Sequence, residues 1–225
     1  MPHTELRSLP ERLPLWLLGC ILFSFGVKLF IDSQLGTDPL HAMIIGIVNT
    51  LDIQYVKIGV IELIIVVLSL FAWCVWNRRF PIVTVVSVFF TMVVVGFLID
   101  TWNYIHVERL TGRLGTPWAL GVAGLFVDAY ASALIIMSGF GIRNMDLLAI
   151  TFVQRLRWPF IVAKMMFEVS FVVVALITHG PVGIATLLFV LIVGSLIQPF
   201  MAWNTMIFHL PNYGMPQTRQ QIAQQ

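Results

Sequence analysis

Charged side chains are scarce in this 225-residue chain: they make up 11% of the residues, whereas hydrophobic residues make up 59%. A soluble domain carries roughly a quarter charged residues, so this chain lacks the polar surface that a water-facing globule needs. The formal net charge is only +2 and no dense basic stripe is present, which argues against a nucleic-acid-binding surface. A membrane bundle of this length is usually one unit.

Cysteine and the motifs of soluble enzymes are also missing. Cys20 and Cys74 both lie inside apolar runs, so neither a disulfide framework nor a cysteine metal cluster is expected. The five histidines lack metal-ligand spacing, and there is no phosphate-binding glycine loop with a lysine and no Gly-x-Ser-x-Gly elbow. A membrane-embedded enzyme would need a nucleophile and a base at one depth, and the sequence nominates none. We therefore expect no enzyme, no cofactor and no metal site.

Long apolar runs fill most of the chain instead. Spanning about 30 Å of hydrocarbon takes about 20 apolar residues, and six segments qualify. They are Leu13–Ile31, Val56–Trp76, Ile82–Trp102, Trp118–Ser138, Phe160–Thr178 and Val182–Trp203. Tryptophans mark many of their ends, as in the aromatic belts at membrane interfaces. The sequence thus predicts an all-α, polytopic transmembrane bundle, with the lipid bilayer as its surroundings.

The basic residues predict the orientation. No small-x-small cleavage site follows the first apolar run, so we expect an uncleaved span preceded by a cytoplasmic segment, residues 1–12. The inside would then hold Arg7, Arg12, Arg78, Arg79, Arg143, Arg155, Arg157 and Arg219, and the outside Lys57, Arg109 and Arg113. This excess favours a cytoplasmic N-terminus. Residues 206–225 are expected to form a polar tail whose Gln-rich end is disordered.

Two further apolar segments, Pro39–Leu51 and Met145–Leu156, are too short for a comfortable span. They fit re-entrant or broken helices, which are tolerated only where protein or a wet cavity shelters the backbone. If both segments crossed, the chain would have eight spans, and the charge bias would still favour an inside N-terminus. The number of crossings therefore stays open at this point.

The chain also resembles itself when it is shifted by about 105 residues. Gly19 then meets Gly124, the two short segments meet each other, and Glu62 meets Glu168 after a one-residue drift. This predicts two transmembrane repeats, residues 13–104 and 117–205. With three full spans in each, the repeats must be inverted, as in many transporters and channels; with four, they would be parallel.

The starts of the short segments are the candidate substrate site. In the first, Gly36 permits a break, Thr37 or Asp38 can cap a helix, and Pro39 suits its first position. Free N–H groups there would attract an anion or polar group. The second segment offers glycines, then Asn144 as the expected cap. The candidate binding residues are Thr37, Asp38, His41, Arg143, Asn144 and Asp146. The alternative is a pair of ordinary capped interfacial helices.

Acidic residues inside apolar runs are costly and usually face the bundle interior. Glu62, Asp128 and Glu168 are therefore the candidate ion-coupling residues, unless they only pair helices structurally. Lys164 and Glu168 are neighbours on a helix and could form such a pair. Outside this set, we expect Lys28 to extend its amine toward the interface and Asp100 to be interfacial.

The run Gln34-Leu35-Gly36-Thr37-Asp38-Pro39-Leu40, which follows a glycine-containing apolar helix, resembles the YczE/YyaS/YitT-type bacterial membrane proteins. The resemblance covers about residues 12–205. It implies a multi-span protein of the bacterial inner membrane, and it supplies no catalytic residues. The second half has Arg143-Asn144 where the first has a proline-containing turn, and this departs from the first-half pattern.

Two functions fit these features. The first is a small secondary transporter or exporter of a small solute, with an ion gradient as its driving force. The second is a non-transporting accessory protein that assembles with another membrane complex, and self-association is open in either case. A polar cavity lined by residues of both halves would favour the transporter, and a dry, sealed interior would favour the accessory protein.

Overall fold

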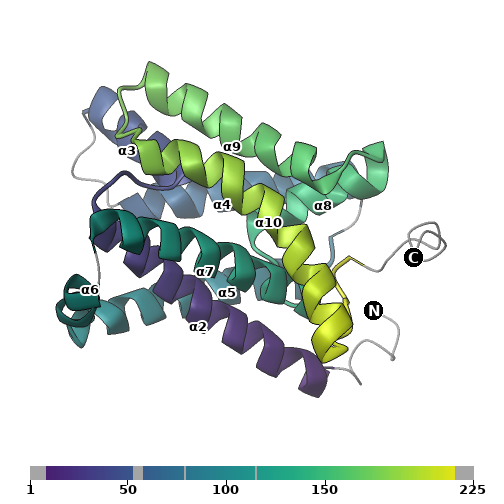
Figure 1. Ribbon diagram of the computed structural model, residues 1–225. Coiled ribbons are helices and arrows are strands. Elements are labelled where there is room, and N and C mark those ends of the chain that lie inside the picture. Colours follow the sequence, from purple (N-terminus) through teal and green to yellow (C-terminus); the bar gives the residue numbers. More distant parts are fainter. Residues whose placement is uncertain (1–8, 53–57, 79, 115, 216–225) are drawn as a thin grey trace.

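The structure is a computed structural model that describes residues 9–52, 58–78, 80–114 and 116–215. These residues form nine helices and no strand (Figure 1). The helices are α2 (Leu9–Ser33), α3 (Pro39–Thr50), α4 (Ile58–Asn77), α5 (Ile82–Tyr104), α6 (Glu108–Leu114), α7 (Pro117–Ser138), α8 (Asn144–Leu156), α9 (Phe160–Ile177) and α10 (Ile184–Phe208). The all-α prediction is confirmed. The short helix α6 was not predicted.

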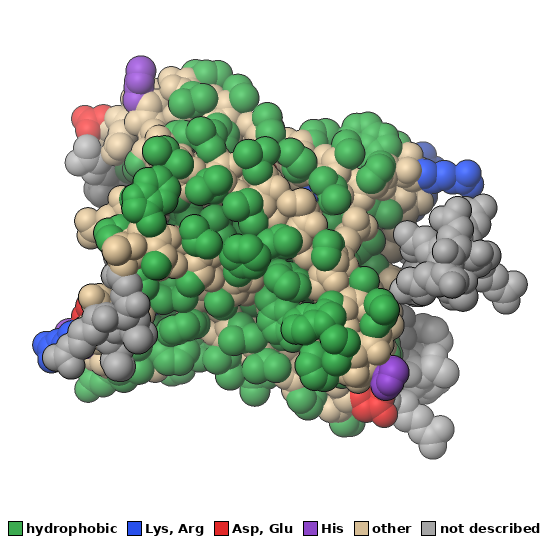
Figure 2. Space-filling view, in the orientation of Figure 1, with side chains coloured by type: hydrophobic (Ala, Val, Ile, Leu, Met, Phe, Trp, Pro, Cys, Tyr) green, Lys and Arg blue, Asp and Glu red, His purple; other side chains and the backbone are tan. Residues whose placement is uncertain are grey.

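Six of these helices, α2, α4, α5, α7, α9 and α10, are long and apolar enough to cross a membrane. They coincide with the six predicted spans to within a few residues at most ends. Figure 2 shows hydrophobic side chains covering the middle of the visible face, whereas charged and histidine side chains gather near its two ends. The chain is therefore a multi-pass helical membrane protein.

Helices α2 and α7 run antiparallel along each other, and small residues lie at their contact. A side chain added at Gly19 would meet Ile135, one at Gly26 would meet the backbone of Gly124, and one at Gly121 would meet Ser33. From Gly19 to Ser33 along α2, the contacted residues of α7 run backward from Ile135 to Gly121, so the two helices are antiparallel. Small residues let transmembrane backbones approach closely, because van der Waals packing replaces the hydrophobic drive in lipid.

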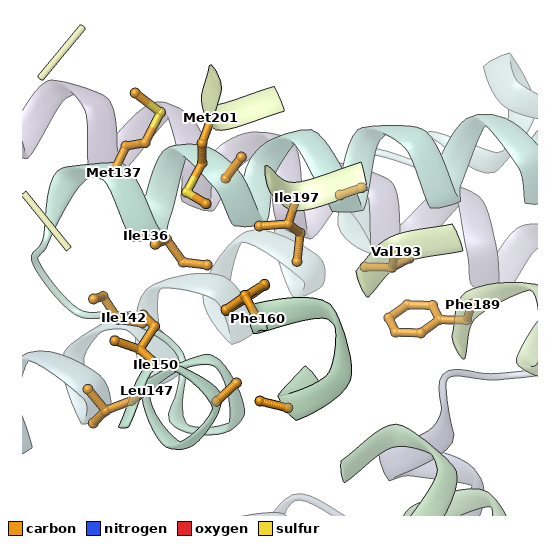
Figure 3. Packing of buried hydrophobic residues seen from close by; sticks show 14 of the residues in the cluster. Ile136, Met137, Ile142, Leu147, Ile150, Phe160, Phe189, Val193, Ile197 and Met201 are labelled. Atoms are coloured by element: carbon orange, nitrogen blue, oxygen red, sulfur yellow. The ribbon is translucent and has the colours of Figure 1, made fainter. Parts of the chain in front are cut away.

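The main apolar core lies where α7, α8, α9 and α10 meet. Phe160, Ile136 and Ile197 are fully buried there and belong to one cluster with residues of all four helices. Figure 3 shows Phe160 at the start of α9, with Ile197 of α10 and Ile136 of α7 beside it. This core packs the start of α9 against α7, the helix that precedes the short helix α8.

The two short helices do not cross the bundle. At 1.5 Å per residue, the 12 residues of α3 and the 13 residues of α8 span about 18–20 Å, against about 30 Å of hydrocarbon. α8 begins beside Ser69, midway along α4, and returns to Asn77 at the end of α4 through Arg155. α3 ends beside Thr178, just after α9. Each short helix thus returns to the end of the bundle from which its loop entered (Figure 1).

Each half therefore has the same order of one long, one short and two long helices. That order is the one the internal repeat predicts, and the repeat itself stays a prediction. Several basic residues used for the orientation, Arg7, Lys57, Arg79 and Arg219, lie outside the described residues, as do residues 1–8 and 216–225. Residues 206–208 extend α10, and the Tyr213 N–H donates to the Met137 carbonyl at 2.8 Å.

The tryptophans are not all belt residues. Trp16 is only 4% exposed, and its indole N–H donates to the Thr91 hydroxyl of α5 at 2.8 Å. Trp73 donates to Thr151 of α8 at 2.7 Å, and Trp102 to Ser24 of α2 at 2.9 Å. These tryptophans therefore join helices to one another, because the hydrogen-bonding need of a buried indole is met by a neighbouring helix.

Single cysteines placed after the two short helices test this topology. Leu51 and Leu156 are 62% and 43% exposed and follow α3 and end α8, respectively. In a background with Cys20→Ala and Cys74→Ala, we expect Leu51→Cys and Leu156→Cys to react with a membrane-impermeant maleimide from opposite sides. Six crossings place these positions on opposite sides, whereas eight crossings place both on one side. Labelling of both from the same side would therefore contradict two re-entrant helices.

Candidate functional site

The loop before α3 is shaped by a glycine and held by a threonine. Gly36 has φ 142°, a conformation that residues with a side chain rarely adopt, and it lies against Gly183. The Thr186 hydroxyl of α10 donates to the Thr37 carbonyl at 2.6 Å. Asp38 then caps α3 through a 3.2 Å bond from the His41 N–H, with Pro39 at the first helical position, so the predicted helix start is confirmed.

The loop before α8 is held in a similar way from the other half. Gly139 and Gly141 have φ values of 63° and 57°. The Thr91 hydroxyl of α5 donates to the Gly141 carbonyl at 2.8 Å, and Trp16 in turn donates to Thr91. A threonine from the last long helix of each half therefore fixes the broken segment of the opposite half.

The prediction that Asn144 caps α8 is wrong. The N-cap is Arg143, which makes no side-chain capping bond, and Asn144 is the first helical residue. The Asn144 amide donates to the Ser69 hydroxyl of α4 instead. Its carbonyl oxygen Oδ1 is buried and has no hydrogen-bond partner. The side chain is thus turned toward α4 rather than back onto its own helix.

Asp146 is the centre of a buried ion network. Its side chain is fully buried, and its Oδ2 accepts from Arg143 Nη2 at 2.6 Å and from Nε at 2.9 Å. Lys164 of α9 places its Nζ 2.8 Å from Asp146 Oδ1 and 2.9 Å from Glu168 Oε1. The Lys164–Glu168 pair expected from the helical spacing is confirmed, and Asp146 joins α8 to it.

Arg143 lies in the bundle rather than in a cytoplasmic loop, so counting it among the inside charges was wrong. Its side chain is 20% exposed, its Nη2 donates to the Ser132 hydroxyl of α7 at 2.7 Å, and its guanidinium lies 4.0 Å from the centre of the Phe23 ring. The fork on Asp146 and the stacking on Phe23 are contacts that suit a guanidinium better than an ammonium. Arg143 therefore links α8 to α7 and α2.

Asp128 differs from the residues of this network because no described cation contacts its carboxyl. It lies in the middle of α7, is 4% exposed, and its Oδ1 has no hydrogen-bond partner. The oxygen lies beside the bare backbone of Gly26, where an added Cβ would be 3.0 Å away. The Ser132 hydroxyl links it to the segment before α8, because this hydroxyl donates to the Asp128 backbone carbonyl at 2.6 Å and accepts from Arg143 Nη2 at 2.7 Å.

Besides the network around Asp146 and the single residue Asp128, a further group of ionisable side chains lies at the start of α3. His41 Nδ1 is 2.6 Å from Asp38 Oδ2, and His41 Nε2 is 3.6 Å from Glu62 Oε2 of α4. These side chains are between 24% and 36% exposed, in contrast to the buried network around Asp146. The imidazole thus bridges two carboxyls and can carry a proton between them.

A separate cluster of ionisable residues lies at one end of the bundle and comprises Lys28, Asp32, His106 and Glu108. Lys28 is only 5% exposed, and its amine extends toward this end of the bundle, where it pairs with Asp32 at 2.8 Å and with Glu108 of α6 at 3.5 Å. The Glu108 backbone N–H and a hydrogen bond with His106 lower the pKa of the Glu108 carboxyl, which keeps it available to this pair. Asp100 is exposed near the end of α5.

Comparison with known proteins agrees with the fold. A family model described as "Family of unknown function (DUF6198)" matches residues 10–202, which include both short helices and nearly all of the six long ones. The chain belongs to this family. It is similar to the uncharacterized protein YyaS of Bacillus subtilis (strain 168), with 28% identity over 190 residues that cover 82% of this chain and 89% of YyaS. No solved structure matches the chain. The predicted resemblance to YyaS-type proteins is confirmed.

In this DUF6198 chain, the nine predicted site residues fall into two adjoining groups. The partly exposed group comprises Asp38, His41 and Glu62, with Thr37 beside them. The buried group comprises Arg143, Asn144, Asp146, Asp128 and Glu168. Their roles in binding stay predictions.

Sequence reasoning missed three residues of this region. Lys164 was expected only as the partner of Glu168, and it also holds Asp146 from another helix. Ser132 and Thr186 are polar residues in apolar helices, a signal that could have nominated them. Their partners lie 11 and 149 residues away, so the contacts themselves could not be read from spacing.

Proposed function

We propose that the protein is a small secondary transporter of the bacterial inner membrane, which moves a small solute and couples that movement to an ion through Asp128. One observation carries the proposal: a carboxyl buried in the middle of a span has an oxygen without a partner. A buried polar group without a partner is costly, and intramembrane acids that persist usually mark ion or substrate paths.

The placement of the broken helices supports this function. In secondary transporters, the substrate and the coupling ion bind where discontinuous helices of two repeats meet. Here the loops before α3 and α8 are each anchored by the opposite half, and Arg143 at the start of α8 bonds the Ser132 hydroxyl that donates to the Asp128 backbone carbonyl. The partly exposed Asp38–His41–Glu62 group can exchange protons with water at the start of α3.

The described basic residues support a cytoplasmic N-terminus. Arg12 at the start of α2 lies 4.2 Å from the centre of the Tyr213 ring, and Tyr213 is bonded to the end of α7. Arg155 bonds Asn77 at the end of α4, immediately before Arg78. These residues therefore share the end of the bundle that carries the N-terminus, as the distribution of basic residues in cytoplasmic loops requires.

Proteoliposomes that contain a pH-sensitive dye test the transport function. The protein is reconstituted, an inside-acid pH gradient is imposed, and amino acids, carboxylates, sugars, methylguanidinium, Na⁺ and K⁺ are added one at a time. We expect at least one solute to drive proton movement in proteoliposomes of the wild type. The control variant Asp100→Asn, which replaces an exposed aspartate, should respond in the same way. Asp128→Asn should abolish the response, because the coupling carboxyl is gone. If no solute of the panel moves protons, the accessory function is favoured instead.

A further inference from the structure

The candidate site carries more negative than positive groups. Two permanent cations, Arg143 and Lys164, face a larger set of carboxyls, which comprises Asp38, Glu62, Asp128, Asp146 and Glu168. Both cations are engaged: Arg143 by Asp146, and Lys164 by Asp146 and Glu168. His41 can offset one charge of the Asp38–Glu62 pair. The carboxyl that no described cation contacts directly is Asp128.

The unsatisfied atoms at this site have one property in common. Asp128 Oδ1, Asn144 Oδ1 and Asp146 Oδ1 are all buried oxygens without a hydrogen bond, and of these only Asp146 Oδ1 has a cation beside it, Lys164 Nζ at 2.8 Å. Asp128 is 4% exposed and Asn144 is 6% exposed, so bulk water does not readily solvate them. A buried acceptor without a donor is costly, and a ligand that supplies N–H groups would satisfy it. An anion or a pure acceptor at Asp128 would meet another acceptor.

The other elements packed on α7 do not supply the missing donor. On α2, Lys28 pairs with Asp32 and Glu108 at one end of the bundle. The described residues of α10 carry no charged side chain. From α8 and α9, Arg143, Asp146, Lys164 and Glu168 face one another, and Asp38 approaches from the loop before α3. The charge on Asp128 is therefore balanced by a proton or by a bound cation.

We propose that the transported solute is a small organic cation that carries N–H groups, a protonated amine or guanidinium, and that it exchanges with a proton on Asp128. This inference rests on the transport function proposed above. In the exchange, the Asp128 O–H bond breaks, the proton leaves to water, and the carboxylate accepts an N–H of the cation. The charge at Asp128 is balanced in both states. The described residues hold no group of three His, Cys, Asp or Glu side chains for a metal ion, which favours an organic cation.

Proton release from purified protein tests the inference. Detergent-solubilised protein in weakly buffered solution with a pH dye is titrated with methylguanidinium, which is permanently charged and carries N–H donors. Tetramethylammonium has the same charge and no N–H, and butyrate is an anion of similar size. We expect methylguanidinium to release protons from the wild type and from Asp100→Asn, and Asp128→Asn to reduce its apparent affinity at least about tenfold. Tetramethylammonium and butyrate should release none.

The outcomes separate this inference from the transport function. If an anionic or neutral solute drives Asp128-dependent proton movement in proteoliposomes and methylguanidinium does not, the transport function stands and the cation inference is overturned. Equal proton release by tetramethylammonium also overturns it, since the N–H groups would then be irrelevant. The comparison of probes on the wild type needs no variant, so it holds even if Asp128→Asn fails to fold. Asp128→Glu, which keeps the carboxyl, should restore the proton release.

Discussion

Asp146→Asn is expected to destabilise the bundle strongly, because Asp146 is the shared counterion of Arg143 and Lys164. An asparagine keeps the shape and removes the charge, so Arg143 loses its charged partner while it stays largely buried. Removing one partner of a buried ion pair costs about 3–5 kcal/mol. At roughly 2–4 °C per kcal/mol for a chain of this size, the melting temperature should fall by on the order of 10 °C. Thermal unfolding of the detergent-purified protein, followed by intrinsic fluorescence, measures the change.

Two further variants make this result specific. Asp100→Asn makes the same chemical change at an exposed position near the end of α5 and should melt within about a degree or two of the wild type, since surface substitutions rarely exceed about 0.5 kcal/mol. The double variant Asp146→Asn, Arg143→Met removes the cation that loses its charged partner, while Lys164 keeps Glu168, and it should recover part of the loss. A melting temperature of Asp146→Asn equal to that of Asp100→Asn would contradict the network.

The parts of the fold that depend on local sequence were predictable. Six spans follow from apolar runs, because lipid selects for about 20 consecutive apolar residues whatever the packing. The start of α3 follows from Asp38 and Pro39, because capping is satisfied within a few residues of the chain. The Lys164–Glu168 pair follows from one helical turn. The polar seven-residue helix α6 has none of these signals, and it was missed.

The errors come from contacts between helices. Asn144 looks like a cap in sequence, but Ser69 of α4 takes its amide. Arg143 looks like a loop charge, and Trp16 looks like a belt residue, but Ser132 of α7 and Thr91 of α5 hold them inside the bundle. In each case a polar side chain at the end of a span has found a partner on another helix, and in lipid such a partner replaces the water that the sequence suggested.

Asp128→Asn should have the opposite effect on stability, although it abolishes proton coupling. Asp128 Oδ1 has no partner to lose, whereas Asp146 has two cations. The amide cannot ionise, so the variant is free of the cost of burying this carboxyl, which must take up a proton on folding because it is ionised in the unfolded chain at neutral pH. We expect a melting temperature at least as high as that of the wild type, measured in the same fluorescence assay at neutral pH.

Asp128→Leu provides the control for shape in that experiment. It also removes the charge, but its methyl groups are larger than the carboxylate oxygens and would crowd the backbone of Gly26, on which even a Cβ would lie only 3.0 Å from Asp128 Oδ1. Overpacking a tight contact costs about 1–3 kcal/mol, so this variant should melt below Asp128→Asn by several degrees. A fall of about 10 °C for Asp128→Asn, similar to that of Asp146→Asn, would instead show a structural counterion at Asp128. A buried carboxyl that is kept for function lowers the free energy of unfolding. Its neutral isostere, asparagine, should restore that free energy while the activity is lost.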